Sequence, residues 1–182
     1  MTLPSSVEGR ERARLFCALR LPDDALDTLC AWQAEQLSGR VVVREHLHIT
    51  LAFLGHRPVD ELGSILAATR DAAARSGTLR LEPIRYRETR SVGMLVLSDE
   101  GGAATALADD LHDRLERLGV YQRENRPWLP HLTVLRFRQR PRLQPSLPEL
   151  GPVSPSDAAV YHSVLRSSGA QYFVVESYAL GG

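Results

Sequence analysis

The chain has 182 residues, and its cationic and anionic side chains balance to a formal net charge of zero. Hydrophobic residues make up 43% of it, which excludes a disordered protein and is enough to fill the core of one domain or of two small lobes. Without a net positive charge, the chain is not expected to coat long nucleic acids, but a local basic pocket for one phosphate is compatible with it.

The first half of the chain predicts the order strand, helix, strand, helix. Residues 1–12 are expected to be a flexible lead, and the weakly alternating segment 14–21 is expected to be a strand. Proline and acidic residues then begin a helix over residues 22–39, which a glycine ends. Residues 41–54 are rich in branched and aromatic side chains and predict a strand, and an apolar stripe predicts a helix over residues 58–77.

The second half predicts five strands and one helix. In chain order these are strands at 78–87 and 92–98, a helix between Gly102 and Gly119, a strand at 131–137, a proline-rich loop at 138–156, and strands at 158–166 and 171–179.

A short repeat links the two halves. In each half, a strand and a helix are followed by a strand with the pattern H-hydrophobic-T-hydrophobic, within EHLHITLAFL in the first half and LPHLTVLRF in the second. A repeat of both topology and motif indicates two related units. We therefore predict an α+β fold, a single domain over residues 1–182. It has two pseudo-symmetric lobes, each an antiparallel sheet with helices on one side, and an active-site cleft between the lobes.

The two motifs are His48–Leu51 (HITL) and His131–Val134 (HLTV). Because strand side chains alternate between faces, the histidine and the threonine of each motif share one face, and the apolar residues share the other. If the lobes are related by a pseudo-two-fold axis, the two polar faces meet across the cleft. An imidazole titrates at about pH 6.5 and can carry protons, and a hydroxyl can donate to phosphate oxygens. The motifs predict in-line displacement at phosphorus.

These segments resemble the two-histidine phosphoesterases, whose signature is one H-hydrophobic-[S/T]-hydrophobic motif in each lobe. HLHITLAFLG at 46–55 and RPWLPHLTVLR at 126–136 are similar to the two motifs of one branch, the bacterial and archaeal RNA 2',3'-cyclic phosphodiesterases, also called 2'-5' RNA ligases. RLFCALRLP at 14–22 and the closing segment from Leu165 to Leu180 are also similar, so the resemblance covers most of the chain.

The resemblance implies a metal-independent reaction without a cofactor. His48 is expected to be the general acid that protonates the leaving 3' oxygen, and His131 the general base that activates water. Thr50 and Thr133 are expected to hold the phosphate. The partners implied are RNA ends with a 2',3'-cyclic phosphate, tRNA fragments among them, and the product is a 2'-phosphomonoester. A monomer is expected, because nothing in the sequence demands more. With a 5'-hydroxyl RNA end in place of water, the same site is expected to make a 2'-5' linkage, reversibly.

Three further residues are candidates for the cleft. Arg136 lies five positions after His131, so strict alternation puts it on the opposite face, although the resemblance favours phosphate binding and a bulge would bring it into the site. Phe53 falls on the apolar face and is interpreted as a core residue, with nucleobase stacking as the alternative. His46 shares the face of His48 by alternation and is interpreted as a surface histidine, with a place in the cleft as the alternative.

Other residues near the motifs have simpler interpretations. Arg126, in the loop before the second motif, is interpreted as solvated. Trp128, in the same loop, is either a platform for a base or an anchor for the loop. His112 lies beside acidic residues on the third helix and is interpreted as part of a solvated face.

Three other functions stay open from the sequence. A metal-dependent hydrolase would use His46, His48 and an acid, but no acid repeats with the motif. A non-catalytic module for RNA ends or nucleotides would keep the fold without the reaction. A phosphodiesterase for another cyclic or 2'-5' nucleotide would keep the site and differ in its loops.

The cysteines and the N-terminus bear on location. Cys17 and Cys30 lack the spacing of a disulfide framework or a zinc knuckle. The N-terminus has no apolar segment of the kind found in signal peptides, and no apolar run reaches the length of a membrane span. A cytoplasmic protein without a membrane partner is expected.

Overall fold

Two four-stranded antiparallel sheets form the framework, and the computed structural model describes residues 11–181. The first sheet has the strand order β3-β1-β7-β8, with bounds Ile49–Pro58, Arg12–Arg20, Asp157–Arg166 and Gly169–Ala179. The second sheet has the order β2-β6-β5-β4, with bounds Arg40–Val41, His131–Arg136, Val92–Asp99 and Leu81–Glu88. The predicted α+β, two-sheet architecture is confirmed.

The predicted flexible lead falls at the edge of the described chain. Most of the segment 1–12 lies outside the described residues, which begin at residue 11. Arg12 already pairs with Pro58 as part of β1, so the expected boundary is wrong there. The alternation of the lead was too weak to show that this pairing extends the strand.

Each motif strand pairs with the first strand of its own half, and β6 has the short strand β2 on its other side. β3 pairs with β1, and β6 pairs with β5, both antiparallel. Thr50 lies opposite Ala18 in the first sheet, and Thr133 lies opposite Met94 in the second. The strand–helix–strand unit predicted from the repeated motif is therefore present twice.

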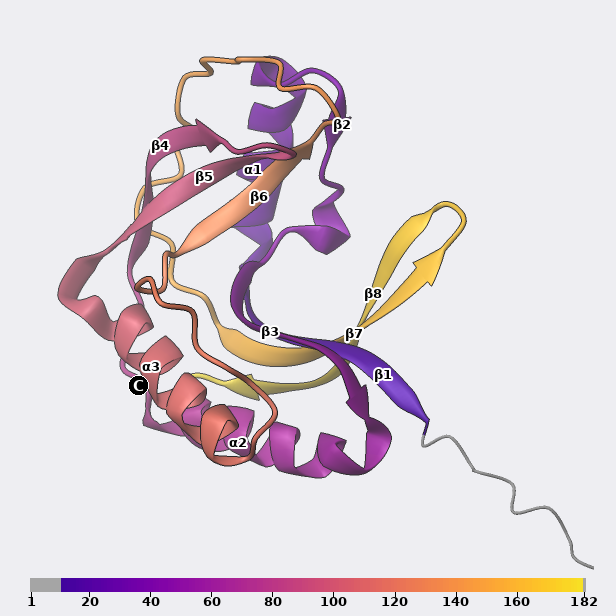
Figure 1. The fold of residues 1–182 in the computed structure, drawn as a ribbon. Coiled ribbons are helices and arrows are strands. Elements are labelled where there is room, and N and C mark those ends of the chain that lie inside the picture. Colours follow the sequence, from indigo (N-terminus) through magenta and orange to yellow (C-terminus); the bar gives the residue numbers. More distant parts are fainter. Residues whose placement is uncertain (1–10, 182) are drawn as a thin grey trace, which may run out of the picture.

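The helices that connect these strands are exchanged between the sheets. α1 (Asp23–Gln36) follows β1 but lies beside β6, to which it hydrogen-bonds (Figure 1). α3 (Ala103–Arg117) follows β5 but packs on α2 (Leu62–Arg75) and contacts β3, while α2 covers β7 and β8. Between residues 11 and 181, no helix is long and apolar enough to cross a bilayer.

The start of α3 shows how the sequence sets a helix boundary. Gly101 and Gly102 turn the chain with positive φ angles of 79° and 75°, which glycine adopts without strain. The Asp99 carboxylate then accepts the backbone N–H groups of Ala104 at 3.1 Å and Thr105 at 2.7 Å. These bonds satisfy amide groups that the first helical turn leaves unpaired, and they place a negative charge at the positive end of the helix.

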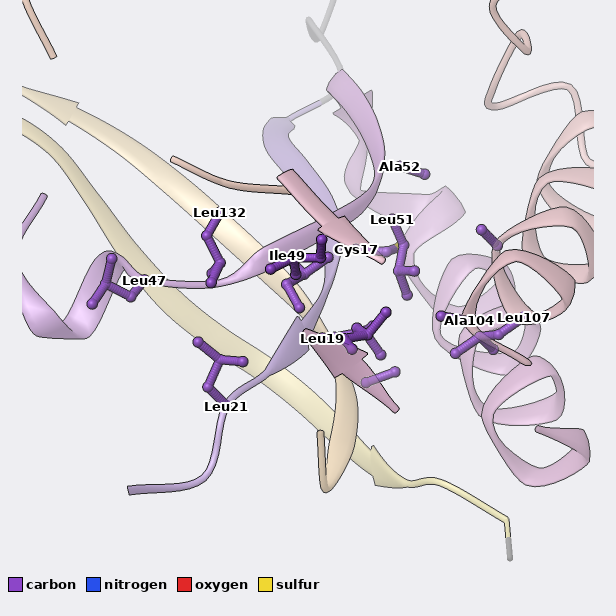
Figure 2. Packing of buried hydrophobic residues seen from close by; sticks show 14 of the residues in the cluster. Cys17, Leu19, Leu21, Leu47, Ile49, Leu51, Ala52, Ala104, Leu107 and Leu132 are labelled. Carbon is purple, nitrogen blue, oxygen red and sulfur yellow. The ribbon is translucent and has the colours of Figure 1, made fainter. Parts of the chain in front are cut away.

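One hydrophobic core joins the inner faces of both sheets to the helices. Leu19 and Leu51 of the first sheet lie on the side that faces Ala104 and Leu107 of α3 (Figure 2). Leu132 of the second sheet belongs to the same cluster, and fully burying such a side chain contributes about 1.5–3 kcal/mol. Because the apolar side of each motif strand is used here, its polar side is left for the cleft.

The predicted strand over residues 41–54 is confirmed from Ile49 onward and is wrong for residues 42–48. β2 ends at Val41, a 3₁₀ turn covers Arg44–His46, and β3 begins at Ile49. The turn is closed by a hydrogen bond from the His46 N–H to the Val43 carbonyl, a local contact that β propensity does not reveal. β3 then continues to Pro58, beyond the predicted end at residue 54, because residues 55–58 pair with β1.

Candidate active site

A cleft of about 540 Å³ lies between the two motif strands. Its lining includes His48 and Thr50 from the first sheet and His131 and Thr133 from the second. The structure therefore brings the four principal candidates into one cavity, with one imidazole and one hydroxyl contributed by each sheet.

His48 lies immediately before β3 and is held at both ring nitrogens. Its Nδ1 is 2.8 Å from the carbonyl oxygen of His46, and its Nε2 is 3.0 Å from the hydroxyl of Thr50. A carbonyl oxygen can only accept a hydrogen bond, so the proton of the neutral ring is on Nδ1. Nε2 then accepts from the Thr50 hydroxyl and is the nitrogen that can take or give a proton in the cleft.

His131 is the first residue of β6 and repeats this arrangement. Its Nδ1 is 2.8 Å from the carbonyl oxygen of Leu129, again two residues earlier in the chain. The same argument puts the proton of the neutral ring on Nδ1 and leaves Nε2 as the exchangeable nitrogen. The two halves therefore orient their imidazoles by the same local backbone contact, which matches the role such bonds have for catalytic histidines.

His48 has a strongly perturbed titration. Its ring packs against Phe16, with 5.0 Å between the ring centroids. Burial lowers the pKa of His48 to about 4, and the positive groups of His46, His131 and Arg136 act in the same direction. The hydrogen bond to the His46 carbonyl opposes these effects. His48 is thus neutral at pH 7 until an anion beside it favours the protonated ring.

A β-bulge brings Arg136 into the cleft. In β6, Thr133 pairs with Met94 and Leu135 pairs with the adjacent Gly93, so the ladder skips Val134. The skip reverses the alternation after Thr133, and Arg136 joins the cleft lining. Strict alternation predicted that Arg136 lies on the opposite face. The alternative prediction, that a bulge brings Arg136 into the site, is the arrangement found.

An equivalent bulge does the same for Phe53. In β3, Thr50 pairs with Ala18 and Ala52 pairs with the adjacent Cys17, so the ladder skips Leu51. Phe53 is 50% exposed and lines the cleft. Its interpretation as a core residue is wrong, because that interpretation assumed unbroken alternation from Leu51.

His46 also lies in the cleft lining, so its interpretation as a surface histidine is wrong. It reaches the cleft from the 3₁₀ turn before the motif, and its ring lies 4.3 Å from that of Tyr172. Partial burial lowers its pKa, while Glu45 opposes the shift. The tyrosine contact is long-range in sequence, so the local pattern could not reveal it.

The two walls of the cleft differ in chemistry. The first sheet contributes Phe16, Phe53 and Tyr172, and the Arg14 guanidinium lies 4.8 Å from the centre of the Phe53 ring. The second sheet contributes two arginines, Arg40 and Arg136, which lie opposite each other on the neighbouring strands β2 and β6. One wall therefore suits a flat aromatic ligand group, and the other suits an anion.

Several of these lining residues were not found from the sequence. Alternation in β1 puts Arg14 and Phe16 on the face opposite Leu15 and Cys17, so a signal existed for them. Arg40 and Tyr172 had no such signal, because only strand pairing brings β2 and β8 to the cleft.

The loop before the second motif is anchored to the first motif by Trp128. The Trp128 indole N–H donates to the Thr50 carbonyl at 3.0 Å, and the ring packs against the core. Trp128 is therefore a loop anchor that ties the second motif to the first. Arg126 is largely exposed and pairs with Glu124 at 2.6 Å, in agreement with the solvated interpretation.

His112 is not on a solvated face, so that interpretation is wrong. It is 3% exposed, and its Nε2 lies 2.7 Å from the Leu51 carbonyl. The acidic neighbours suggested that His112 faces solvent, but α3 turns this one polar residue toward β3.

The part of the chain that the structure describes holds no group of three or more histidine, cysteine or acidic side chains placed to bind one metal ion.

Comparisons with known proteins agree with the motifs. The model of the 2'-5' RNA ligase superfamily matches residues 21–169. The RNA 2',3'-cyclic phosphodiesterase of Escherichia coli (strain K12) is 30% identical over 129 residues, which cover 69% of this chain and 73% of that protein. The protein of the same name from Thermus thermophilus is 28% identical over 93% of this chain and 91% of that protein.

Solved structures share the fold. The Thermus thermophilus protein TT0787 superposes with a TM-score of 0.79 at 30% identity, covering 93% of this chain and 98% of its own. Escherichia coli LigT in its apo form has a TM-score of 0.80 at 24% identity, and the match covers 94% of this chain and 99% of LigT. The chain belongs to the 2'-5' RNA ligase superfamily, the family that its two histidine motifs indicate.

Proposed function

We propose that the protein is an RNA 2',3'-cyclic 3'-phosphodiesterase that hydrolyses cyclic phosphate ends to 2'-phosphomonoesters without a metal ion. The observation that carries the proposal is the pair of imidazoles in one cleft, each with Nδ1 bound to a backbone carbonyl and Nε2 available for a proton. The curated relatives that carry this name support the choice of substrate.

The reaction divides the two proton transfers between the histidines. His131 Nε2 takes a proton from water, and the water oxygen forms a bond to phosphorus. The bond between phosphorus and the 3' oxygen breaks, and His48 Nε2 gives its proton to that oxygen. The product carries a 2'-phosphate and a free 3'-hydroxyl. Each positioned proton transfer is typically worth about 10²–10⁴ in rate.

The remaining polar groups suit the phosphate. The hydroxyls of Thr50 and Thr133 and the guanidinium of Arg136 donate to the non-bridging oxygens, where negative charge must be stabilised in the transition state. The same negative charge raises the pKa of His48 from its low value and so supplies the protonated ring that a general acid requires. Substrate binding and acid activation are thereby linked.

The remaining surface of the cleft suits the nucleoside. Phe53 and Tyr172 offer rings on which an unpaired base can stack, with Arg14 above Phe53. His46 lies against Tyr172 and extends this wall. With a 5'-hydroxyl RNA end in place of water as the nucleophile, the same groups would open the cyclic phosphate to a 2'-5' linkage, in keeping with the ligase activity for which the family is named.

The test is product analysis in the presence of EDTA. A short RNA ending in a 2',3'-cyclic phosphate is incubated with the wild type and with His48→Ala and His131→Ala, and the position of the product phosphate is determined. We expect a 2'-phosphate from the wild type alone. A 3'-phosphate, a requirement for metal, or equal conversion by either variant would contradict the proposal, and tight binding without conversion would indicate a non-catalytic RNA-end module.

A further inference from the structure

Two buried polar side chains approach the motif strands from behind, on the side away from the cleft. Gln33 of α1 is 3% exposed, and its Nε2 donates to the Val134 carbonyl at 2.9 Å. His112 of α3 is equally buried, and its Nε2 donates to the Leu51 carbonyl at 2.7 Å. Neither side chain lines the cleft, and the reaction proposed above uses neither.

Their acceptors are the two residues that the strand ladders skip. Leu51 and Val134 each lie three positions after the motif histidine, at the centre of the two β-bulges. A bulge leaves its extra residue outside the ladder, and a buried carbonyl without a partner costs about 1–3 kcal/mol. His112 supplies that partner to the Leu51 carbonyl. The Val134 carbonyl has two donors, the Gln33 side chain and the Val42 N–H at 3.0 Å, and Gln33 Nε2 also donates to the Val42 carbonyl at 3.0 Å.

The two contacts are counterparts in the pseudo-symmetric frame. Gln33 follows the last residue of β1, Arg20, by 13 positions, and His112 follows the last residue of β5, Asp99, by the same number. Because the connecting helices are exchanged, each side chain supports the motif strand of the other half. Two different residue types at one equivalent position donate a hydrogen bond to the equivalent backbone carbonyl of a motif strand. This indicates that the bond, and not the residue type, is what the position requires.

We propose that Gln33 and His112 are positioning residues that hold the two bulges and thereby keep Arg136 and Phe53 in the cleft. If a bulge relaxed into regular pairing, the alternation after it would reverse. Arg136 or Phe53 would then turn toward the core, and the small or apolar residue before it would face the cleft. Gln33 thus acts through Arg136 on the phosphate side, and His112 acts through Phe53 on the nucleoside side.

The first test needs no substrate. In the wild type the rings of Phe16 and Phe53 stack at 6.5 Å, and the Arg14 guanidinium lies over Phe53. Nuclear Overhauser contacts between the two rings and the ring-current shift of the Arg14 side chain therefore report where Phe53 lies. We expect His112→Leu to lose both signals and His112→Gln, which keeps an N–H donor, to retain them.

Gln33→Leu is the matched control, because it removes the equivalent bond from the other strand. It should leave the Phe53 signals unchanged. Signals that persist in His112→Leu, or that disappear equally in Gln33→Leu, would overturn the proposal. If the leucine variant does not fold, His112→Asn takes its place, since asparagine is polar but too short to reach the carbonyl, and the same two outcomes apply.

The second test rests on the proposed function and uses double-mutant cycles on the cyclic phosphate substrate. His112→Leu should raise KM severalfold in the wild-type background and have little further effect in Phe53→Ala. Gln33→Leu should couple in the same way to Arg136→Ala. Effects that simply multiply in every pair would indicate general destabilisation instead. Absence of turnover in the wild type would contradict the function, while the ligand-free spectra still decide the positioning role.

Discussion

Phe53 and Arg136 are counterparts in the two halves of the protein, each five residues after a motif histidine and each turned into the same cleft by a β-bulge. One contributes an apolar ring and the other a guanidinium. The frame is therefore pseudo-symmetric, but the cleft is not. For the proposed substrate, this asymmetry predicts one orientation, with the phosphate toward Arg136 and the base toward Phe53.

Removing the guanidinium should weaken catalysis through the phosphate. We expect Arg136→Ala to lower kcat/KM about 10–100-fold, since a hydrogen bond to a charged group is worth about 1.5–3 kcal/mol. Arg136→Lys should recover only part of the loss, because an ammonium lacks the planar fork. Steady-state kinetics on a cyclic phosphate RNA measure the effect. Arg126→Ala is the control, and an equal loss there would show that only the overall charge matters.

Removing the ring should weaken binding of the nucleoside. Phe53→Ala is expected to raise KM about 5–100-fold with little change in kcat, because stacking of one base contributes about 1–3 kcal/mol. Phe53→Tyr should behave like the wild type. Phe173→Ala is the matched control, since Phe173 is exposed to a similar degree, 48%, and is not part of the cleft lining. A KM unchanged by Phe53→Ala would place the base elsewhere.

The burial of His48 predicts a pH dependence of stability. Its pKa is about 4 in the folded protein and about 6.5 when unfolded, so the unfolded state binds more protons between these values. The free energy of unfolding should therefore fall by about 2–3 kcal/mol from this group as the pH drops from about 6.5 to 4. Urea denaturation across this range measures it. His48→Asn should show a shallower fall, and an unchanged slope would mean that His48 does not titrate as described.

Ligand binding should raise the pKa of His48. We expect adenosine 2'-monophosphate, the product type of the proposed reaction, to bind with uptake of a proton near pH 6, because its negative charge favours the imidazolium. Calorimetry in buffers of different ionisation enthalpy counts the protons. The uptake should be smaller in His48→Asn than in the wild type. Equal uptake in both proteins would assign the proton to the ligand phosphate and leave His48 neutral.

The sequence predicted which four motif residues meet in the cleft, but it did not predict most of the residues that surround them. His48, Thr50, His131 and Thr133 were identifiable because each motif lies within one stretch of strand, and because its repetition after an equivalent strand and helix indicates two related lobes. Local alternation is a reliable guide over such a short span.

Arg136 and Phe53 lie beyond the point where that guide works. A bulge depends on how a strand pairs with its neighbour, and no pattern within β3 or β6 marks Leu51 or Val134 as the skipped residue. His112 was misassigned for a related reason. Its helix has acidic neighbours, but the exchange of helices between the sheets, which the sequence does not show, turns this side chain toward β3.

The division of labour between His48 and His131 can be tested by changing the leaving group. In a substrate whose 3' bridging oxygen is replaced by sulfur, the leaving thiolate needs no proton, so a general acid becomes dispensable. We predict that His48→Ala, inactive on the oxygen substrate, hydrolyses the sulfur substrate at a rate near that of the wild type, while His131→Ala stays inactive on both. Rescue of His131→Ala instead would reverse the two roles, and rescue of neither variant would contradict acid–base catalysis by this pair.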